Sequence, residues 1–165
     1  MLDTVFGLPV HPLIVHATVV VVPTAAATVL LAALWPRFRR WAGLLPLGLA
    51  LVALVLDPLS TQSGDQLESH VGSSPLVEKH AQLADMLLPW VIVLVVGAAA
   101  SYWLHRRSDR GTGDPRRLAW LPAVASVVAV VAALGTGVQV VLIGHSGAEA
   151  AWHGVAAQHA GGSGQ

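Results

Sequence analysis

Cysteine is absent from this chain of 165 residues, and charged and aromatic residues are scarce. The lack of cysteine excludes disulfides, zinc ribbons, thiol catalysis, thiolate iron–sulfur ligation and covalent haem attachment. Charged residues make up 11% of the chain and aromatic residues 5%, which is too little for the surface and core of an ordinary soluble domain. Nine basic residues balance nine acidic ones, so no nucleic-acid or other polyanionic partner is expected.

Hydrophobic residues, mostly Ala, Val and Leu in long runs, make up 55% of the chain. Four runs approach or exceed the roughly 20 helical residues that cross a bilayer. Short connections favour antiparallel neighbours, so we predict an all-α fold: an integral membrane four-helix bundle with up-down-up-down topology. Residues 1–160 form a single domain in this prediction, and residues 161–165 form a disordered tail. The predicted spans are residues 12–35, 41–63, 81–104 and 118–143.

The second span has the least certain end. Its uninterrupted apolar part stops at Leu56, and Asp57-Pro58 follows. The polar residues 59–63 are then either the end of the helix, facing protein, or already a loop. The long connection over residues 64–79 is predicted as a loop.

Arginine is confined to one side of the predicted membrane. Eight of the nine basic residues lie in the connections 36–40 and 105–117. By the positive-inside rule these connections are cytoplasmic, and both termini are extracytoplasmic. Trp35, Trp41 and Trp103, with Trp120, fall at the same ends, where an aromatic belt is expected. The predicted location is therefore the cell membrane, which the chain crosses several times, with the lipid bilayer as the first partner.

Histidine gathers on the opposite side, where seven of the eight histidines lie together with most of the acidic residues. With a helical rise of about 1.5 Å per residue, His16, Thr61 and Asp85 all lie roughly 28–30 Å from the inner ends of their helices. His11, His80 and His145 form a second layer about 8–12 Å further out. Ionisable groups at such depths face the interior of a bundle and mark functional sites.

Each of these histidines has a structural alternative to a ligand role. His16 is either a ligand oriented by Asp85 or a structural residue bonded to Asp85 or Thr61. His80 is either a ligand or a solvated residue at the start of the third helix. His145 lies between two glycines just after the fourth predicted span, where it either binds a flat ligand or belongs to a glycine helix cap.

The polar residues also carry a resemblance to a known family. Residues 7–16, 61–64, 77–85 and 139–148 are similar to the bacterial membrane proteins grouped as domain of unknown function 2231, particularly their actinobacterial branch. The resemblance covers nearly the whole chain and implies a four-span membrane domain of unassigned activity. Some relatives are fused to Rieske iron–sulfur domains, which implies electron transfer by analogy.

Three functions follow from these patterns. The first is a b-type haem, bound for electron transfer near the outer surface, with two of His16, His80 and His145 as axial ligands from different helices. The second is a site for a transition metal, zinc, copper or iron. Its candidate ligands are His11, His16, His80, His145 and Asp85, with Asp65 or Glu68.

The third function is that of a non-catalytic membrane subunit, which docks a Rieske-type or other redox protein or a transport partner. Thr61, Asp65 and Gln139 are expected to support the site, and Gln139 is expected to bond across the bundle. An independent enzymatic activity has the least support, because His145 next to Ser146 in sequence gives no triad geometry. A homo-oligomer is compatible with the sequence.

Overall fold

The computed structural model describes residues 4–5, 8–71, 74–109 and 120–161, with side chains over residues 13–66, 74–107, 120–150 and 152. Most of the predicted tail at 161–165 and most of the connection 105–117 lie outside the described residues, and residue 161 is the last of a helix. Two strands of two residues, β1 (Thr4–Val5) and β2 (Leu8–Pro9), form an antiparallel pair before the helices. The helices are α1 (Val10–Leu34), α2 (Pro36–Ala42), α3 (Leu45–Val71), α4 (Pro75–Asp85), α5 (Leu87–Asp109) and α6 (Leu121–Gly161).

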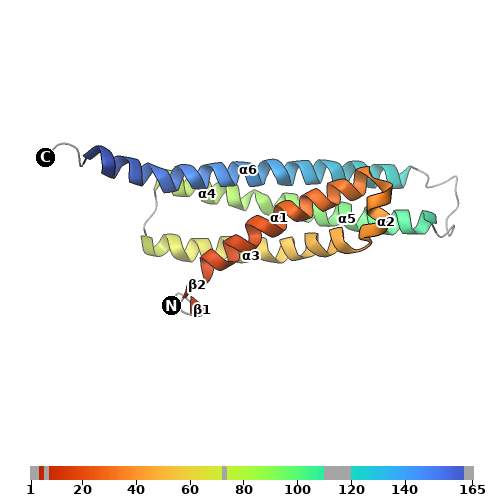
Figure 1. Cartoon of the computed structure of the whole chain (residues 1–165), viewed down its shortest axis with the longest axis horizontal. Coiled ribbons are helices and arrows are strands. Elements are labelled where there is room, and N and C mark those ends of the chain that lie inside the picture. The colour runs from red at the N-terminus through yellow and green to blue at the C-terminus, as the bar shows by residue number, and fades with distance from the viewer. Residues whose placement is uncertain (1–3, 6–7, 72–73, 110–119, 162–165) are drawn as a thin grey trace.

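Four long rods lie side by side, formed by α1, by α3, by α4 with α5, and by α6 (Figure 1). Going round the bundle, α1 packs on α3, α3 on α5, α5 on α6, and α6 on α1. Each rod therefore neighbours the next one in sequence, and the predicted all-α four-helix bundle is confirmed. Four segments are long and apolar enough to cross a membrane: Leu13–Leu34, Leu45–Gln66, Pro75–Arg107 and Leu121–Ala150.

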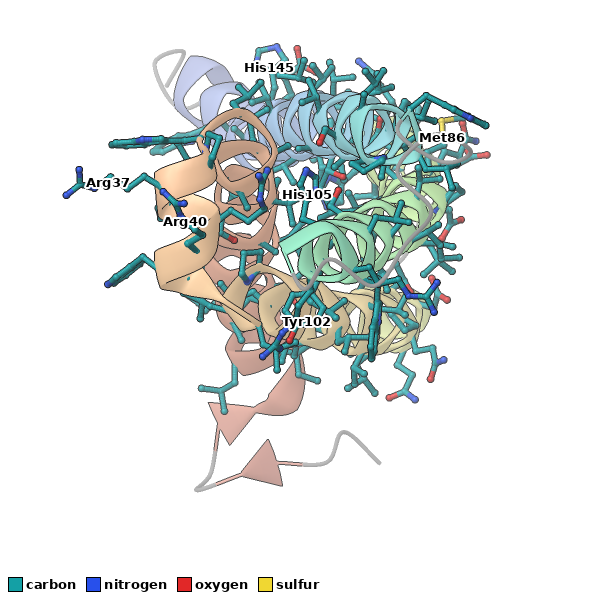
Figure 2. All side chains as sticks on the ribbon, turned by 90° about the vertical axis from the view of Figure 1, so that its right-hand side faces the viewer. Arg37, Arg40, Met86, Tyr102, His105 and His145 are labelled. Carbon is teal, nitrogen blue, oxygen red and sulfur yellow. The ribbon has the colours of Figure 1, made fainter. Side chains whose placement is uncertain are left out.

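One end of the bundle carries arginine. Arg37 and Arg40 project from α2, which connects α1 and α3 where the sequence suggested only a loop (Figure 2). Pro36 stands at the first turn of α2, and Gly43, with φ 55°, ends it. The placement of Trp41 in the second span is therefore wrong, because this residue belongs to α2. We call this end the arginine end and the opposite end, which carries His16, His80 and His145, the histidine end.

The aromatic belt lies at the arginine end. Trp35, Trp41, Trp103 and Trp120 are exposed there by 55–76% of their surface. Rings with an apolar body and a polar N–H are favoured at a membrane surface, so their exposure agrees with the boundary predicted from the sequence.

Helix α3 does not stop at Asp57-Pro58 but runs on to Val71. The proline removes one backbone donor, yet neighbouring helices can support the altered turn, as in other membrane helices. One turn further on, the hydroxyl of Thr61 donates to the carbonyl of Pro58 at 3.1 Å. The predicted loop at 64–79 is therefore wrong over most of its length, since α3 and α4 occupy it.

The third rod is broken instead, between α4 and α5 at Met86. Pro89 explains the break, because a proline ring clashes with the carbonyl four residues earlier, here that of Asp85. Asp85 thereby becomes the last residue of α4.

The fourth rod is longer than predicted. Helix α6 does not end near Ile143; it continues through Gly144 and Gly147 to Gly161. Ser146, between the two glycines, is 3% exposed and packs toward α4, so tertiary contacts offset the low helix propensity of glycine. The interpretation of this segment as a glycine cap is wrong.

Small residues hold the bundle together. Eight of the thirteen residues in the buried cluster are alanine, and we call this group the alanine core. At Gly97 of α5 an added Cβ would lie 2.9 Å from the Cα of Ala129 in α6, so the two backbones almost touch. Close approach of this kind is how helices associate in lipid. The alanine core consists of Val22, Ala25, Ala26, Val29, Ala50, Ala53, Leu87, Val91, Leu94, Ala98, Ala129, Ala132 and Ala133.

Candidate functional site

A cavity of about 620 Å³ lies among the helices toward the histidine end. All four rods contribute to its wall, so it belongs to the interior of the bundle rather than to one helix surface. Its size is within the range of ligand pockets. The lining residues are Val15, Thr18, Val19, Val22, Asp57, Ser60, Thr61, Gly64, Asp65, Val77, His80, Ala81, Ala84, Asp85, Leu87, Val140, Ile143, Gly144 and Gly147.

Asp57 is the most unusual group in this wall. It lies in the middle of α3 and is only 2% exposed. Its Oδ2 atom is buried and has no hydrogen-bond partner. A buried polar atom without a partner costs about 1–3 kcal/mol, and more for a charged group. A carboxyl group kept at such a cost inside a membrane span indicates a binding role.

The electrostatics of the cavity favour positive charge. Asp65 and Asp85 share the wall with Asp57, and no lysine or arginine is found among the described residues that line it. Asp85 is also the last residue of α4, so the partially negative C-terminal end of that helix lies at the cavity. The three carboxyl groups and the C-terminal end of α4 therefore all favour a positively charged ligand in the cavity.

Two hydroxyl groups of the wall, those of Thr18 and Thr61, present lone pairs to the cavity rather than protons. Thr18 donates its hydroxyl proton to the carbonyl of Ile14 at 2.9 Å, and Thr61 donates to the carbonyl of Pro58 at 3.1 Å. A hydroxyl whose only proton is used can still accept. The polar part of the cavity is thus composed largely of acceptors.

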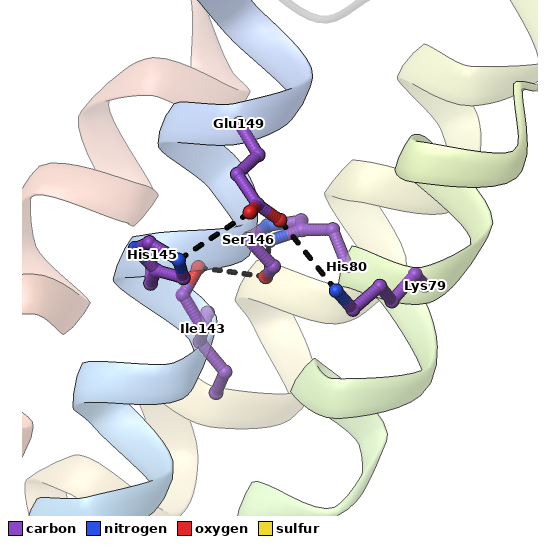
Figure 3. Close-up of polar contacts among 6 residues, drawn as sticks. All are labelled: Lys79, His80, Ile143, His145, Ser146 and Glu149. Atoms are coloured by element: carbon purple, nitrogen blue, oxygen red, sulfur yellow. Dashed lines mark hydrogen bonds and ion pairs between the residues drawn. The ribbon is translucent and has the colours of Figure 1, made fainter.

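His80 lines the cavity from α4 and is held by Ser146 of α6 (Figure 3). Its Nδ1 lies 3.0 Å from the Oγ of Ser146, and that Oγ donates to the carbonyl of Ile143 at 3.0 Å. Because the serine proton is used, Nδ1 acts as the donor to Ser146, and the lone pair of a neutral ring is on Nε2. The pair joins two helices; it is not arranged as a nucleophile with its base, in which the imidazole would accept the serine proton.

Glycine allows this contact. At Gly147 an added Cβ would lie 3.1 Å from Cε1 of His80, so a side chain there would press on the ring. The two glycines of α6 that the sequence marked for close approach therefore differ: Gly147 faces His80, whereas a Cβ at Gly144 would meet nothing within 4 Å.

His145 does not face the cavity. It lies on the outer surface of α6 (Figure 2), its side chain is 73% exposed, and its Nε2 is 3.4 Å from Glu149 (Figure 3). Lys79 reaches the same carboxylate at 3.5 Å. His145 and Ser146 are adjacent in sequence, but one step of an α-helix turns a side chain by about 100°, which puts the serine inside and the histidine outside.

His16 is exposed and is not among the residues that line the cavity. Of the three predicted axial ligands, His80 alone lines it, so the structure does not gather His16, His80 and His145 around one cavity. In the part of the chain with described side chains, no group of three or more His, Asp or Glu residues could hold a metal ion. The side chains of His11 and Glu68, also predicted as metal ligands, lie outside the described residues.

The three residues predicted to support the site, Thr61, Asp65 and Gln139, do not share one role. Thr61 and Asp65 line the cavity, as do the predicted ligands His80 and Asp85. Gln139 instead donates from Nε2 to the carbonyl of Leu83 at 2.6 Å, which confirms that it bonds across the bundle. This carbonyl is one of the last four of α4, which have no partner within their own helix.

Two residues of the site were missed by sequence reasoning. Asp57 was interpreted as the end of an apolar run, although a single acid inside a hydrophobic stretch was itself the available signal. Ser146 has no signal of its own in the sequence, because a serine between two glycines is equally typical of a loop.

A family profile described as "Predicted membrane protein (DUF2231)" matches residues 7–159, which include all four motifs that carry the resemblance. No curated protein and no solved structure matches the chain.

Proposed function

The chain belongs to the DUF2231 family of predicted membrane proteins, and we propose that this multi-pass membrane protein binds a protonated amine in the cavity at its histidine end. The observation that carries the proposal is the buried, unpartnered Oδ2 of Asp57 in the wall of the cavity. An ammonium group would supply both the missing hydrogen bond and the missing positive charge.

The donor and acceptor inventory favours an amine over other ligands. Asp57, Asp85 and Nε2 of a neutral His80 can accept hydrogen bonds, and the hydroxyls of Thr18 and Thr61 have used their protons. A primary ammonium has three N–H donors and no acceptor, so it complements this wall. An anion would be repelled by the carboxylates, and a quaternary ammonium would bring charge without donors.

The distribution of arginine supports an orientation as well. With the arginine end in the cytoplasm, the cavity lies on the outer side of the membrane and both termini are extracytoplasmic. The amine would then come from outside the cell or from the outer leaflet.

The test is calorimetric titration of the protein in lipid nanodiscs with hexylamine, using empty nanodiscs as the blank. We expect binding of hexylamine, weaker binding of hexyltrimethylammonium, and none of hexanoate. Asp57→Asn keeps the shape of the side chain but removes its charge, and it should weaken hexylamine binding by about tenfold to a hundredfold, the effect of losing one charged hydrogen bond.

Glu78→Gln is the matched control, because Glu78 is an exposed acid of α4 that does not line the cavity. Its hexylamine affinity should equal that of the unaltered protein. Hexanoate binding as tightly as hexylamine, or an Asp57→Asn variant with unchanged affinity, would refute the proposal.

A b-type haem for electron transfer is the second candidate, and the position of His80 supports it. The ring lines the cavity, its Nδ1 is held by Ser146, and a neutral imidazole has the Nε2 lone pair that haem iron binds. When bound, haem would supply the one-electron chemistry; His80 would hold the iron and Ser146 would fix the ring. Added haemin should give a Soret band that His80→Ala removes and His145→Ala leaves unchanged.

The transition-metal site and the docking of a Rieske-type or transport partner stay predictions. His80 and Asp85 are the two predicted metal ligands that line the cavity. Zinc or copper bound in stoichiometric amount and lost in His80→Ala would favour the metal over the amine.

A further inference from the structure

Helix α1 lies obliquely across the bundle. At the arginine end it runs beside α6, and at the histidine end it lies near α3 (Figure 1). The other rods run more nearly parallel to one another (Figure 1). Helices α1 and α6 therefore diverge toward the histidine end, which is the part of the bundle where the cavity lies.

The cavity wall includes residues of both diverging helices. Val15 and Val19 of α1 and Ile143 and Gly144 of α6 line it. Val19 is 60% exposed, and a Cβ added at Gly144 would meet nothing within 4 Å. Small or exposed residues on both sides leave the wall open between α1 and α6.

The α1 side of this opening lies at the depth of the hydrocarbon. Val15 and Val19 belong to the candidate span Leu13–Leu34, and Gly144 belongs to the span Leu121–Ala150. Val19 is six residues inside its span, about 9 Å along the helix axis. A molecule that enters beside Val19 therefore approaches from the apolar part of the bilayer.

We infer that the ligand of the cavity enters sideways from the bilayer, between α1 and α6, and that it is therefore an amphipathic amine with an apolar chain. The ammonium part of this inference depends on the proposed function; the route of entry does not. The apolar chain would lie against Val15, Val19 and Ile143, and the head group would lie against Asp57 and Asp85.

The route can be measured without any amine, since the natural chain contains no cysteine. Ala84→Cys places one thiol in the cavity wall on α4. In liposomes, this thiol is treated either with N-dodecylmaleimide, which dissolves in lipid, or with a charged methanethiosulfonate reagent confined to water. We expect labelling by the maleimide to be the more complete, as a fraction of what the same reagent labels in denatured protein.

A tryptophan at Gly144 should close the opening, because space is free there. Added to Ala84→Cys, Gly144→Trp should slow maleimide labelling by roughly tenfold, the effect of about 1.4 kcal/mol on a barrier. Gly137→Trp is the matched control: Gly137 lies two turns away on the same face of α6, its Cβ position is equally free, and it does not line the cavity. Val19→Trp tests the opposite side of the opening.

Equal labelling in the Gly144→Trp and Gly137→Trp proteins, together with faster labelling by the charged reagent, would overturn lateral entry in favour of access from water. The proposed function is judged separately, by the effect of Asp57→Asn on hexylamine binding. A protein that labels from lipid but binds no amine would refute the proposed function and leave the route standing.

Discussion

The cavity region and the alanine core are built from the same four rods by opposite means. In the alanine core, small side chains bring α5 and α6 into backbone contact at Gly97 and Ala129. Toward the histidine end, the oblique course of α1 and the break at Met86 separate the rods around 620 Å³ of space. At the arginine end, by contrast, the cavity beside Ser101 measures only about 30 Å³, room for one or two waters. The difference indicates that the core supplies stability and the cavity region supplies function.

The largest expected effect contrasts two leucines. Leu94 is fully buried in the alanine core, whereas Leu87 lies in the core but also lines the cavity. Leu94→Ala should lower the free energy of unfolding by about 3 kcal/mol, because it opens a new void in a tightly packed region. Leu87→Ala only enlarges an existing space and should cost about 2 kcal/mol, the lower end of the range for such a change. Titration with SDS in mixed micelles, followed by circular dichroism, measures both. Equal losses would contradict the contrast between the two regions.

Two glycines of adjacent rods provide the next comparison. Gly97→Ala places a Cβ at 2.9 Å from a backbone atom of Ala129, and should destabilise the fold by about 2 kcal/mol through overpacking. Gly144→Ala meets nothing within 4 Å and should be neutral or stabilising by up to about 1 kcal/mol, because alanine favours a helix. The same SDS titration reports the sign of each change. A neutral Gly97→Ala would mean that α5 and α6 can separate without loss.

The sequence was sufficient to predict the number of long helices and the end of the bundle that carries arginine. Runs of apolar residues predicted four helices, and the arginines and tryptophans marked one end of the bundle, because both signals depend on the chemistry of the bilayer rather than on packing details. Depth counted along the helices put Thr61 and Asp85 near the same height, and both line the cavity. Height needs only the helical rise, so it is accessible from the sequence.

The direction in which a side chain points around its helix could not be predicted from the sequence in the same way. His145 and Ser146 are neighbours in sequence, but the first is exposed and the second is buried, because they lie on different faces of α6. Which of them faces α4 depends on how α6 packs on α4, and no residue of α6 alone decides this. Asp57 was missed for another reason: Asp-Pro is typical of a helix end in water, whereas in a membrane bundle the helix continues and buries the acid.

Asp57 gives the third prediction, in which stability and binding change in opposite directions. Asp57→Asn should raise the free energy of unfolding by about 1 kcal/mol, because an uncharged amide costs less to bury than a carboxyl group without a partner. The same variant is expected to bind hexylamine more weakly. Unfolding by SDS, measured without amine, tests the first half. A less stable Asp57→Asn protein would mean that the carboxyl group supports the fold and is not reserved for a ligand.

The smallest expected effect concerns the contacts that hold α4 to α6 at the histidine end. Glu149 of α6 pairs with Lys79 of α4 at 3.5 Å and, within α6 itself, with His145 at 3.4 Å, but these side chains are 43–73% exposed. Exposed ion pairs contribute about 0.2–1 kcal/mol and are screened by salt, so Glu149→Gln should lower stability by less than about 0.5 kcal/mol, and less still at high salt.

Ser146→Ala is the comparison for Glu149→Gln, because Ser146 is 3% exposed and bonds His80 directly. Its loss leaves the ring nitrogen of His80 without its partner and should cost about 1 kcal/mol, independent of salt. Unfolding of both variants at low and high salt separates the two contacts. If Glu149→Gln proves the more damaging of the two, the exposed Lys79–Glu149 ion pair rather than the buried hydrogen bond holds α4 in place, and His80 is less firmly positioned for a ligand than its geometry suggests.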